Sequence, residues 1–223
     1  MDPPPKRRRK RASTLPQRDV TSRQAAEQAV TTANAETDDG LSNHSPGRPD
    51  LHIQAYRAST MPDSLKKWTF DLTKTNMFTL YDKTWGWNAR QKRRELYHQH
   101  ARFLVACSSE KYSVFTRKEK DDIRLPSPLA FIHIRFEIET GDVPGVYVYD
   151  LQTSHKHQGK GIGSALMDAV EQIGKSYKME KCSLTVLKVN RDAKRFYEKR
   201  GYKRDEHTPT EETCVYIILS KKL

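Results

Sequence analysis

A strict two-residue alternation over residues 132–139 constrains the fold more than any other feature of this sequence. The order Ile-His-Ile-Arg-Phe-Glu-Ile-Glu places apolar and polar side chains in turn. Because successive side chains of a strand point to opposite faces, the pattern predicts a strand with one buried face. Residues 140–145 contain two glycines and a proline, which predict a turn. Residues 146–153 are then expected to return as an antiparallel partner strand.

Other periodic patterns predict helices and strands on both sides of this hairpin. Helices are expected over 63–81, 89–98, 161–177 and 191–199, and strands over 102–107, 183–189 and 213–219. The order of elements is helices, strand, hairpin, helix, strand, helix, strand. This order predicts an α/β domain with a mixed central β-sheet flanked by helices.

Composition separates the first fifty residues from the rest. Residues 1–50 are rich in Ser, Thr, Asn, Asp and Gln, and we expect a mostly disordered basic tail with a short helix over 22–35. Residues 51–223 are expected to form one folded domain. The basic block Lys6–Arg11 is typical of a nuclear localisation signal or of a nucleic-acid contact. It favours a protein of the nucleus and cytoplasm.

The charge of the chain favours an anionic partner. Residues 1–50 hold 9 Lys and Arg against 7 Asp and Glu, so +10 of the net +12 belongs to residues 51–223. A phosphorylated cofactor, nucleic acid or both would suit such a body, although plain solvation explains the charge equally well. No apolar run approaches 18 residues, so we expect no membrane span. The three cysteines are widely spaced and predict no metal site.

A glycine-rich segment, Gln-Gly-Lys-Gly-Ile-Gly-Ser over 158–164, joins the predicted hairpin to the next helix. Glycines let a backbone approach a ligand closely, and a helix start offers free N–H groups to a diphosphate. No Gly-Lys-Ser/Thr ends the segment as in a Walker loop. Its G-x-G-x-G spacing after an antiparallel hairpin also differs from the dinucleotide fingerprint. A tight turn without a ligand is the alternative interpretation.

The spacing Gln158-x-x-Gly161-x-Gly163 resembles the Q/R-x-x-G-x-G/A signature of GNAT acetyltransferases, and the order of elements over about 102–220 is similar to their core. The resemblance implies the GNAT fold, acetyl-CoA as co-substrate and no metal. Asn190 would contact the cofactor, although Asn190 is equally suited to cap the helix 191–199. The other implied cofactor contacts are Leu151, Gln152 and Thr153 for the pantetheine arm and Gly159, Lys160, Gly161, Ile162, Gly163 and Ser164 for the phosphates.

A narrower resemblance, over about 65–220, is to the NatD family of N-terminal acetyltransferases. Thr75-Asn76-Met77, Trp85-Gly86-Trp87, Arg135-Phe136-Glu137, Tyr147-Val148-Tyr149-Asp150 and Leu184-Thr185-Val186 carry it. That family acetylates the N-terminal α-amine of histone H4 and histone 2A, whose tails begin Ser-Gly-Arg-Gly. The implied peptide site comprises Tyr81, Trp85, Glu137, Ile138, Glu139, Tyr147, Tyr149, Thr185 and Tyr216. Glu137 and Asp150 exchange carboxylate length relative to the family pattern, which changes their reach by one methylene.

The acceptor chemistry agrees with that site. Glu137 and Glu139 share one face of their strand and could receive the arginine of a histone tail. From the pattern alone, a plain solvent face is the simpler interpretation of these two carboxylates. Asp150 is the predicted general base, directly or through water, with Tyr149 shaping the path of the proton. A backbone N–H near Leu151 would stabilise the developing oxyanion.

Two alternative functions stay open at this stage. One is a GNAT enzyme that acetylates lysine side chains or small amines. The other is a non-enzymatic basic module that binds chromatin, for which the net charge of +12 and Lys6–Arg11 speak. The expected partners are the tails of histone H4 and histone 2A, with a nucleic-acid contact through Lys6–Arg11 and no membrane. We expect a monomer.

Overall fold

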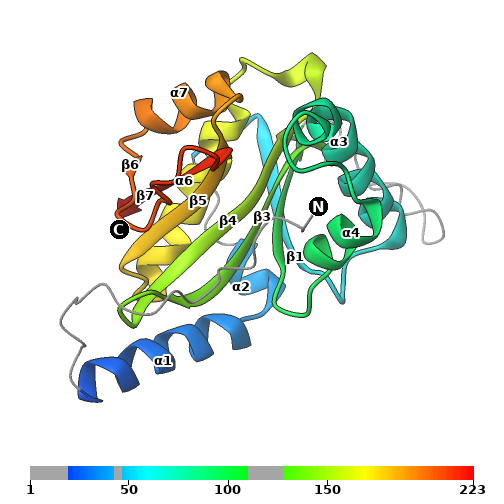
Figure 1. The fold of residues 1–223 in the computed structure, drawn as a ribbon. Coiled ribbons are helices and arrows are strands. Elements are labelled where there is room, and N and C mark those ends of the chain that lie inside the picture. The colour runs from blue at the N-terminus through cyan, green and yellow to red at the C-terminus, as the bar shows by residue number, and fades with distance from the viewer. Residues whose placement is uncertain (1–19, 43–46, 110–127) are drawn as a thin grey trace, which may run out of the picture.

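The computed structural model describes residues 20–42, 47–109 and 128–223. Its centre is one seven-stranded sheet in the order β1-β2-β3-β4-β5-β7-β6 (Figure 1). The strands are β1 Leu51–Arg57, β2 Arg102–Ser108, β3 Pro128–Glu139, β4 Val143–Thr153, β5 Lys181–Leu187, β6 Lys203–Arg204 and β7 Tyr216–Lys222. The helices are α1 Val20–Ala35, α2 Asp38–Ser42, α3 Asp63–Asp82, α4 Ala89–Leu96, α6 Ile162–Ser176 and α7 Arg191–Lys199, with a 3-10 turn η1 at His155–His157.

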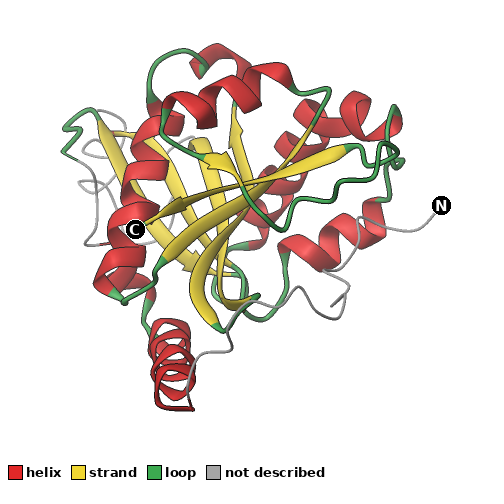
Figure 2. Ribbon diagram, turned by 60° about the vertical axis from the view of Figure 1, so that its left-hand side comes forward, coloured by secondary structure: helices red, strands yellow, loops and turns green. Residues whose placement is uncertain are grey.

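The sheet is mixed, and helices lie on both of its faces (Figure 2). β4 and β5 run parallel, and the remaining neighbouring strands are antiparallel. The predicted α/β architecture and the predicted β3–β4 hairpin are therefore confirmed. Strand β1 was not predicted from the sequence, although its alternate residues Leu51, Ile53 and Ala55 are buried. Helix α2 and the two-residue strand β6 were not predicted either.

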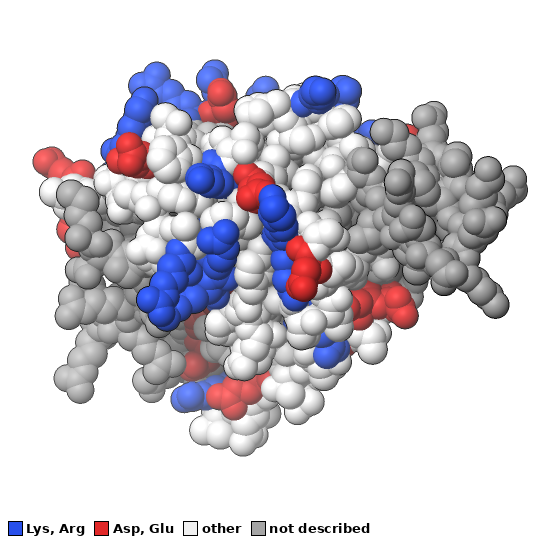
Figure 3. Space-filling model, turned by 90° about the vertical axis from the view of Figure 1, so that its right-hand side faces the viewer, with Lys and Arg blue, Asp and Glu red and all other residues white. Residues whose placement is uncertain are grey.

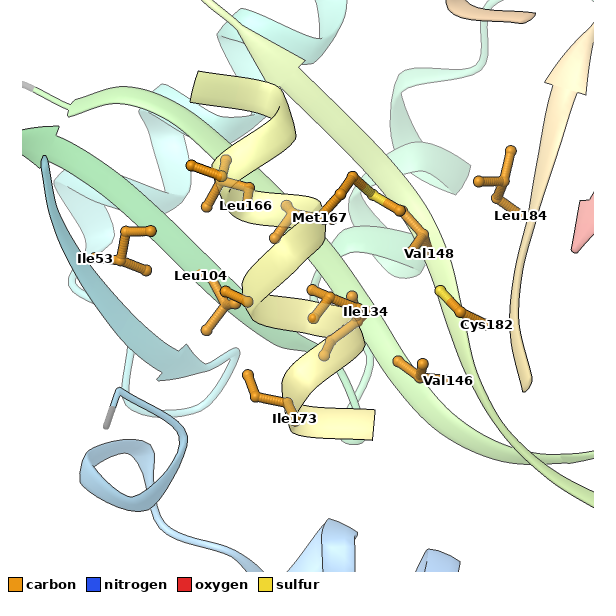
Figure 4. Packing of buried hydrophobic residues seen from close by; sticks show 14 of the residues in the cluster. Ile53, Leu104, Ile134, Val146, Val148, Leu166, Met167, Ile173, Cys182 and Leu184 are labelled. Atoms are coloured by element: carbon orange, nitrogen blue, oxygen red, sulfur yellow. The ribbon is translucent and has the colours of Figure 1, made fainter. Parts of the chain in front are cut away.

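Two apolar clusters hold the helices to the sheet. One lies between the sheet and α6, where Leu166, Met167 and Ile173 face Leu104 and Ile134 (Figure 4). The amphipathic face of α6 explains this packing, because its apolar positions recur at helical spacing. The other cluster lies under α3 and α4 on the opposite face. No helix of the described residues is long and apolar enough to cross a membrane.

Residues 20–42 pack on the folded body, and α1 covers the positions of the short helix expected over 22–35. Ala26, Ala33 and Leu41 are buried. Arg57 donates to the carbonyl oxygens of Ala35 and Glu36, just past the end of α1. Alanine-rich sequence alone gives only a marginal helix, and these tertiary contacts fix it. The basic block Lys6–Arg11 lies outside the described residues, as do residues 110–127.

Candidate active site

The sheet splits between β4 and β5. The two strands pair only from Gly145 to Val148 on β4, opposite Lys181 to Leu184 on β5. At Tyr149 the register of β4 against β3 shifts, so His133 lies opposite Asp150 and Ile134 opposite Val148. The extra residue bends the strand away from its parallel neighbour. Beyond Val148, no strand of the described residues pairs with the edge of β4 that faced β5.

A glycine loop lies at the open end of this split. Gly159 and Gly161 adopt left-handed φ values of 73° and 78°, which side chains other than glycine rarely tolerate. Gly161 occupies the N-cap position of α6, and no side chain caps that helix. The first-turn N–H groups of Ile162, Gly163 and Ser164 are consequently free to bind an anion. Lys160 is exposed beside them. The loop therefore fits a diphosphate group.

The predicted cofactor residues of β4 and α7 have further contacts. Gln152 is buried, and its Oε1 accepts a hydrogen bond of 3.0 Å from Asn76 Nδ2 on α3. The same amide donates to the carbonyl oxygen of Thr153 at 3.2 Å. Asn76 thus fastens α3 to the free end of β4, a role that sequence reasoning missed. Asn190 Oδ1 accepts the Ala193 N–H at 3.2 Å, which is the N-cap role.

The acceptor face, which we define as Glu137, Tyr147, Tyr149 and Thr185, lies on the stretch of sheet where β3, β4 and β5 meet. Tyr149 donates its hydroxyl to Glu137 Oε1 at 2.8 Å. The ring of Tyr147 lies edge-on to that of Tyr149, with centroids 4.9 Å apart. Tyr147 also shares a hydrogen bond between hydroxyls with Thr185 on β5. The structure therefore brings these four predicted peptide-site residues together.

An aromatic cluster of Tyr81, Trp85, Trp87 and Tyr216 lies between α3 and the start of β7. The Tyr81 ring is 5.4 Å from Trp85 and 5.8 Å from Trp87. Trp85 in turn meets Tyr216, with centroids 6.1 Å apart. Three of the predicted peptide-site residues thus touch one another although they come from distant parts of the chain. Ile138 is exposed, with 36% of its surface accessible, at the end of β3.

Comparison with known proteins identifies the family. The model of the Acetyltransferase (GNAT) family matches residues 74–202, which is more than half of the chain. The chain belongs to the GNAT acetyltransferase family. The split sheet and the uncapped glycine loop are the features on which its cofactor would rest.

Solved acetyltransferases share this fold at low sequence identity. Arabidopsis thaliana Naa50, in complex with the bisubstrate analogue CoA-Ac-MVNAL, is 18% identical with a TM-score of 0.50, covering 77% of this chain and 99% of that one. Arabidopsis thaliana NAA60, also with a bisubstrate analogue, is 11% identical with a TM-score of 0.52 and covers 77% and 99%. The PaiA N-acetyltransferase of Thermoplasma acidophilum, in complex with coenzyme A, is 18% identical with a TM-score of 0.51 and covers 77% and 99%.

Glu139 does not join Glu137 in an open acidic face of this acetyltransferase. Only 4% of Glu139 is exposed. Its Oε1 accepts a hydrogen bond from Ser183, and its Oε2 lies 3.3 Å from Lys181 Nζ. The two carboxylates share a face of β3, as the alternation predicts, but β5 covers the second one. This burial corrects the expectation that both carboxylates receive the same arginine and leaves Glu137 as the accessible one.

Asp150 is a buried member of an ion pair in the acetyltransferase. Its carboxylate lies 2.8 Å from Lys92 Nζ, and the two side chains are 1% and 7% exposed. His133 Nδ1 is 3.4 Å from the same carboxylate. Burial alone would raise the pKa of Asp150, but the Lys92 ammonium and His133 outweigh it, so the pKa lies below its usual value. Asp150 is therefore a weak base in this environment. The sequence analysis did not identify Lys92.

Burial also raises the pKa values of two further residues, Tyr197 and Cys182. Tyr197 of α7 is buried, and burial raises its pKa. Burial also raises the pKa of the Cys182 thiol to about 12. Because the thiolate is the nucleophilic form, Cys182 is inert at neutral pH. Within the described residues, no group of three or more His, Cys, Asp or Glu could hold a metal ion.

Proposed function

We propose that this acetyltransferase transfers the acetyl group of acetyl-CoA to the N-terminal α-amine of histone H4 and histone 2A, whose chains begin Ser-Gly-Arg-Gly. The observation that carries the proposal is the Glu137 carboxylate. It is held by Tyr149 next to the split in the sheet, while the neighbouring carboxylates Glu139 and Asp150 are buried in ion pairs. One accessible anion beside the cofactor cleft suits a short cationic chain end.

The cofactor would lie along the split. Residues 159–164 would hold the phosphates through free N–H groups, and the open edge of β4 over Leu151–Thr153 would pair with the pantetheine arm. When bound, acetyl-CoA supplies the activated thioester. A cofactor held there would present its thioester on the side of Tyr149 and Asp150, which would remove most of the entropy cost of bringing amine and thioester together. The Leu151 N–H is the proposed oxyanion donor.

The peptide would lie across the acceptor face and the aromatic cluster. Glu137 would bind the arginine at the third position, because a carboxylate and a guanidinium form paired charge-assisted hydrogen bonds. Tyr147, Thr185, Tyr81, Trp85 and Tyr216 would line the path of the peptide backbone. A protein body of charge +10 repels a cationic tail in general. The local carboxylate is therefore needed for recognition.

The lowered pKa of Asp150, the proposed base, favours an α-amine over a lysine side chain as the acceptor. At pH 7.5 roughly a third of α-amines are neutral, against roughly 0.1% of lysine side chains. An α-amine thus needs little help to become a nucleophile. Asp150, acting through water with Tyr149 shaping the path, has only to accept the last proton. A lysine would demand a base with a higher pKa than the Lys92-paired Asp150 provides.

The basic surface favours a nucleic-acid contact beside this catalytic function. Figure 3 shows many Lys and Arg side chains, with Asp and Glu side chains among them, on the face that carries α3 and α4. Arg90, Arg93 and Arg94 of α4 are exposed. Together with Lys6–Arg11, this face would attract nucleic acid in a salt-dependent manner and would suit an enzyme that meets histones in the nucleus and cytoplasm.

A peptide assay tests the proposed function. A Ser-Gly-Arg-Gly peptide should be acetylated, and blocking its N-terminus should abolish the reaction even when a lysine is present further along. Replacing the arginine by alanine should raise KM about tenfold to 100-fold, as expected for one charge-assisted pair. Undiminished acetylation of the blocked peptide would instead assign the enzyme to lysine side chains.

Two glycine substitutions test the cofactor half of the proposal. Gly161→Asp should lower acetyl-CoA affinity by about 100-fold, because it adds a negative charge and a strained left-handed residue to the cradle. Gly201→Asp is the matched control, since Gly201 has a φ of 85° at the end of α7 and a Cβ there meets nothing within 4 Å. Calorimetry should show near-normal affinity in the control. Equal affinity in both variants would argue for a different cofactor site.

A further inference from the structure

Arg48, which precedes β1 and lies outside the matched family region of residues 74–202, reaches the glycine loop. Its Nη1 donates a hydrogen bond of 3.4 Å to the carbonyl oxygen of Lys160. The same nitrogen lies 3.1 Å from the position that a Cβ would occupy on Gly161. A guanidinium from the segment before β1 thus covers Gly161, the residue at the N-cap of α6. In Figure 1 the start of β1 lies at the same end of the sheet as the start of α6.

Asp50 fixes the orientation of this guanidinium. Asp50 Oδ1 accepts from Arg48 Nε at 2.7 Å, and Oδ2 accepts from Nη2 at 2.6 Å. This fork uses the outer edge of the guanidinium and turns Nη1 towards the loop. The second Nη1 hydrogen has no acceptor among the described residues. The Arg48 side chain is 35% exposed, so a ligand can reach it.

We propose that Arg48 is a cofactor-binding residue that contacts a phosphate group of acetyl-CoA. Free first-turn N–H groups of α6 and the Arg48 Nη1 face the same small volume, and both are donors that prefer an anion. Lys160 adds a further positive charge beside them. The inference rests on the use of acetyl-CoA in the proposed function and adds a residue from the N-terminal segment to that site.

A purely structural role is the rival explanation of this arginine. An exposed Arg–Asp pair contributes little to stability, and a single bond of 3.4 Å to Lys160 adds little more. The Arg48–Asp50 pair therefore stabilises the protein too little to explain why the guanidinium lies over Gly161. The two explanations differ in a measurable way, because a phosphate contact changes cofactor affinity, whereas a structural clasp changes the stability of the protein without cofactor.

A charge series at Arg48 in the full-length protein tests the inference. Arg48→Ala should weaken acetyl-CoA binding in calorimetry about tenfold, and Arg48→Glu should weaken it further by repulsion. Arg48→Lys should fall between wild type and Arg48→Ala, since it keeps the charge but loses the planar fork. The melting temperature without cofactor should stay within about 2 °C of wild type in all three. Arg23→Ala is the control, because Arg23 is a surface partner of Glu27 on the same N-terminal segment.

Acetyl-dephospho-CoA, which lacks the 3′-phosphate, identifies the phosphate involved. If Arg48 contacts the 3′-phosphate, Arg48→Ala should lose affinity for acetyl-CoA alone. If it contacts the pyrophosphate, the loss should be equal for both ligands. Wild-type affinity in Arg48→Ala, or a loss matched by Arg23→Ala, would overturn the inference. Absence of acetyl-CoA binding by the wild-type protein would instead overturn the proposed function itself.

Discussion

The glycine loop, where we propose that the cofactor binds, and the acceptor face are built in opposite ways. The loop over 155–164 is one continuous segment, and its chemistry is that of backbone N–H groups and two left-handed glycines. The acceptor face takes Glu137 from β3, Tyr147 and Tyr149 from β4 and Thr185 from β5, and its chemistry is that of side chains. The first region depends mainly on backbone conformation, with positive charge from Lys160 and Arg48 beside it. The second region depends on strand register and on which side chains neighbouring strands cover.

This difference predicts different consequences of substitution. In the loop, a change is expected to act through backbone conformation or charge and to affect cofactor binding alone. On the acceptor side, two chemically identical side chains on one strand can have separate roles, because burial divides them. Asp150 lies where the two regions meet, and it is the first residue of β4 after the register shift. Substitution of Asp150 is therefore expected to have the largest effect.

Asp150→Asn is expected to cost about 3 kcal/mol of stability, because it removes the buried partner of the Lys92 ammonium and leaves that ammonium paired only with the partly exposed Glu95. Urea denaturation would measure this loss. The double variant Lys92→Gln with Asp150→Asn should recover most of the stability, since a neutral hydrogen-bonded pair replaces the ion pair. This comparison separates the structural role of the pair from its role in proton transfer.

The activity of the double variant then tests whether Asp150 is the general base. If Asp150 accepts the proton, the recovered protein should still turn over about 100-fold or more slowly, as general-base catalysis requires. Single-turnover rates at pH 7 to 9 would show whether the loss shrinks as the α-amine deprotonates by itself. A recovered protein with the wild-type rate would make the pair structural and remove Asp150 from the mechanism.

Glu137→Gln and Glu139→Gln sharpen the contrast between accessible and buried carboxylates. Glu137→Gln should raise KM for Ser-Gly-Arg-Gly by about 30-fold, or about 2 kcal/mol, with little change in melting temperature. Glu139→Gln should lower stability by about 1–3 kcal/mol, because it breaks a buried pair with Lys181 and weakens the bond to Ser183. The peptide KM of this second variant should stay near wild type.

If Glu137 binds the peptide, its substitution should change the peptide KM and leave acetyl-CoA affinity unchanged. Acetyl-CoA affinity, measured in parallel, should be unchanged in Glu137→Gln. Loss of peptide and cofactor binding together would place Glu137 in a general structural role. A larger KM effect in Glu139→Gln than in Glu137→Gln would show that β5 opens to admit the substrate.

Sequence reasoning predicted the cofactor region better than the acceptor region. The hairpin, the glycine loop and helices α6 and α7 follow from local periodicity and from glycines at fixed spacing, so the printed residues are sufficient. The sequence contains no comparable signal for the register shift at Tyr149. The residues of β3 and β4 around this point would pair equally well with or without the shift. The split between β4 and β5 could therefore be expected from family resemblance alone.

Long-range contacts account for the other differences. A lysine in the basic run Arg90–Arg94 reads as a solvated residue, yet the packing of α4 on the sheet buries Lys92 against Asp150. Likewise, α1 reads as a marginal helix until Arg57 and Arg102 bind the carbonyl oxygens of its last turn and of the residue beyond it. Neither set of contacts could be predicted from local sequence patterns, because the partners lie far apart in the chain.

His133 gives the smallest expected effect and concerns the pH dependence of the acceptor side. Its ring stacks between Phe103 and Tyr149, with both centroids 5.0 Å away. Burial lowers the pKa of His133 from 6.5, and the nearby Asp150 carboxylate only partly opposes that effect. The folded state therefore binds its proton less readily than the unfolded chain. Stability that is complete above pH 6.5 should decline as pH falls towards the lowered pKa.

The slope of this decline is at most about 1.4 kcal/mol per pH unit for a single group. His133→Phe keeps an aromatic ring in the stack but cannot titrate, so its free energy of unfolding should lose this dependence between pH 6.5 and 5. His52, whose pKa burial also lowers, is present in both proteins and cancels in the difference. Parallel curves for wild type and variant would mean that His133 titrates as in the unfolded chain. The acceptor side would then contain more water around Asp150 than its burial indicates.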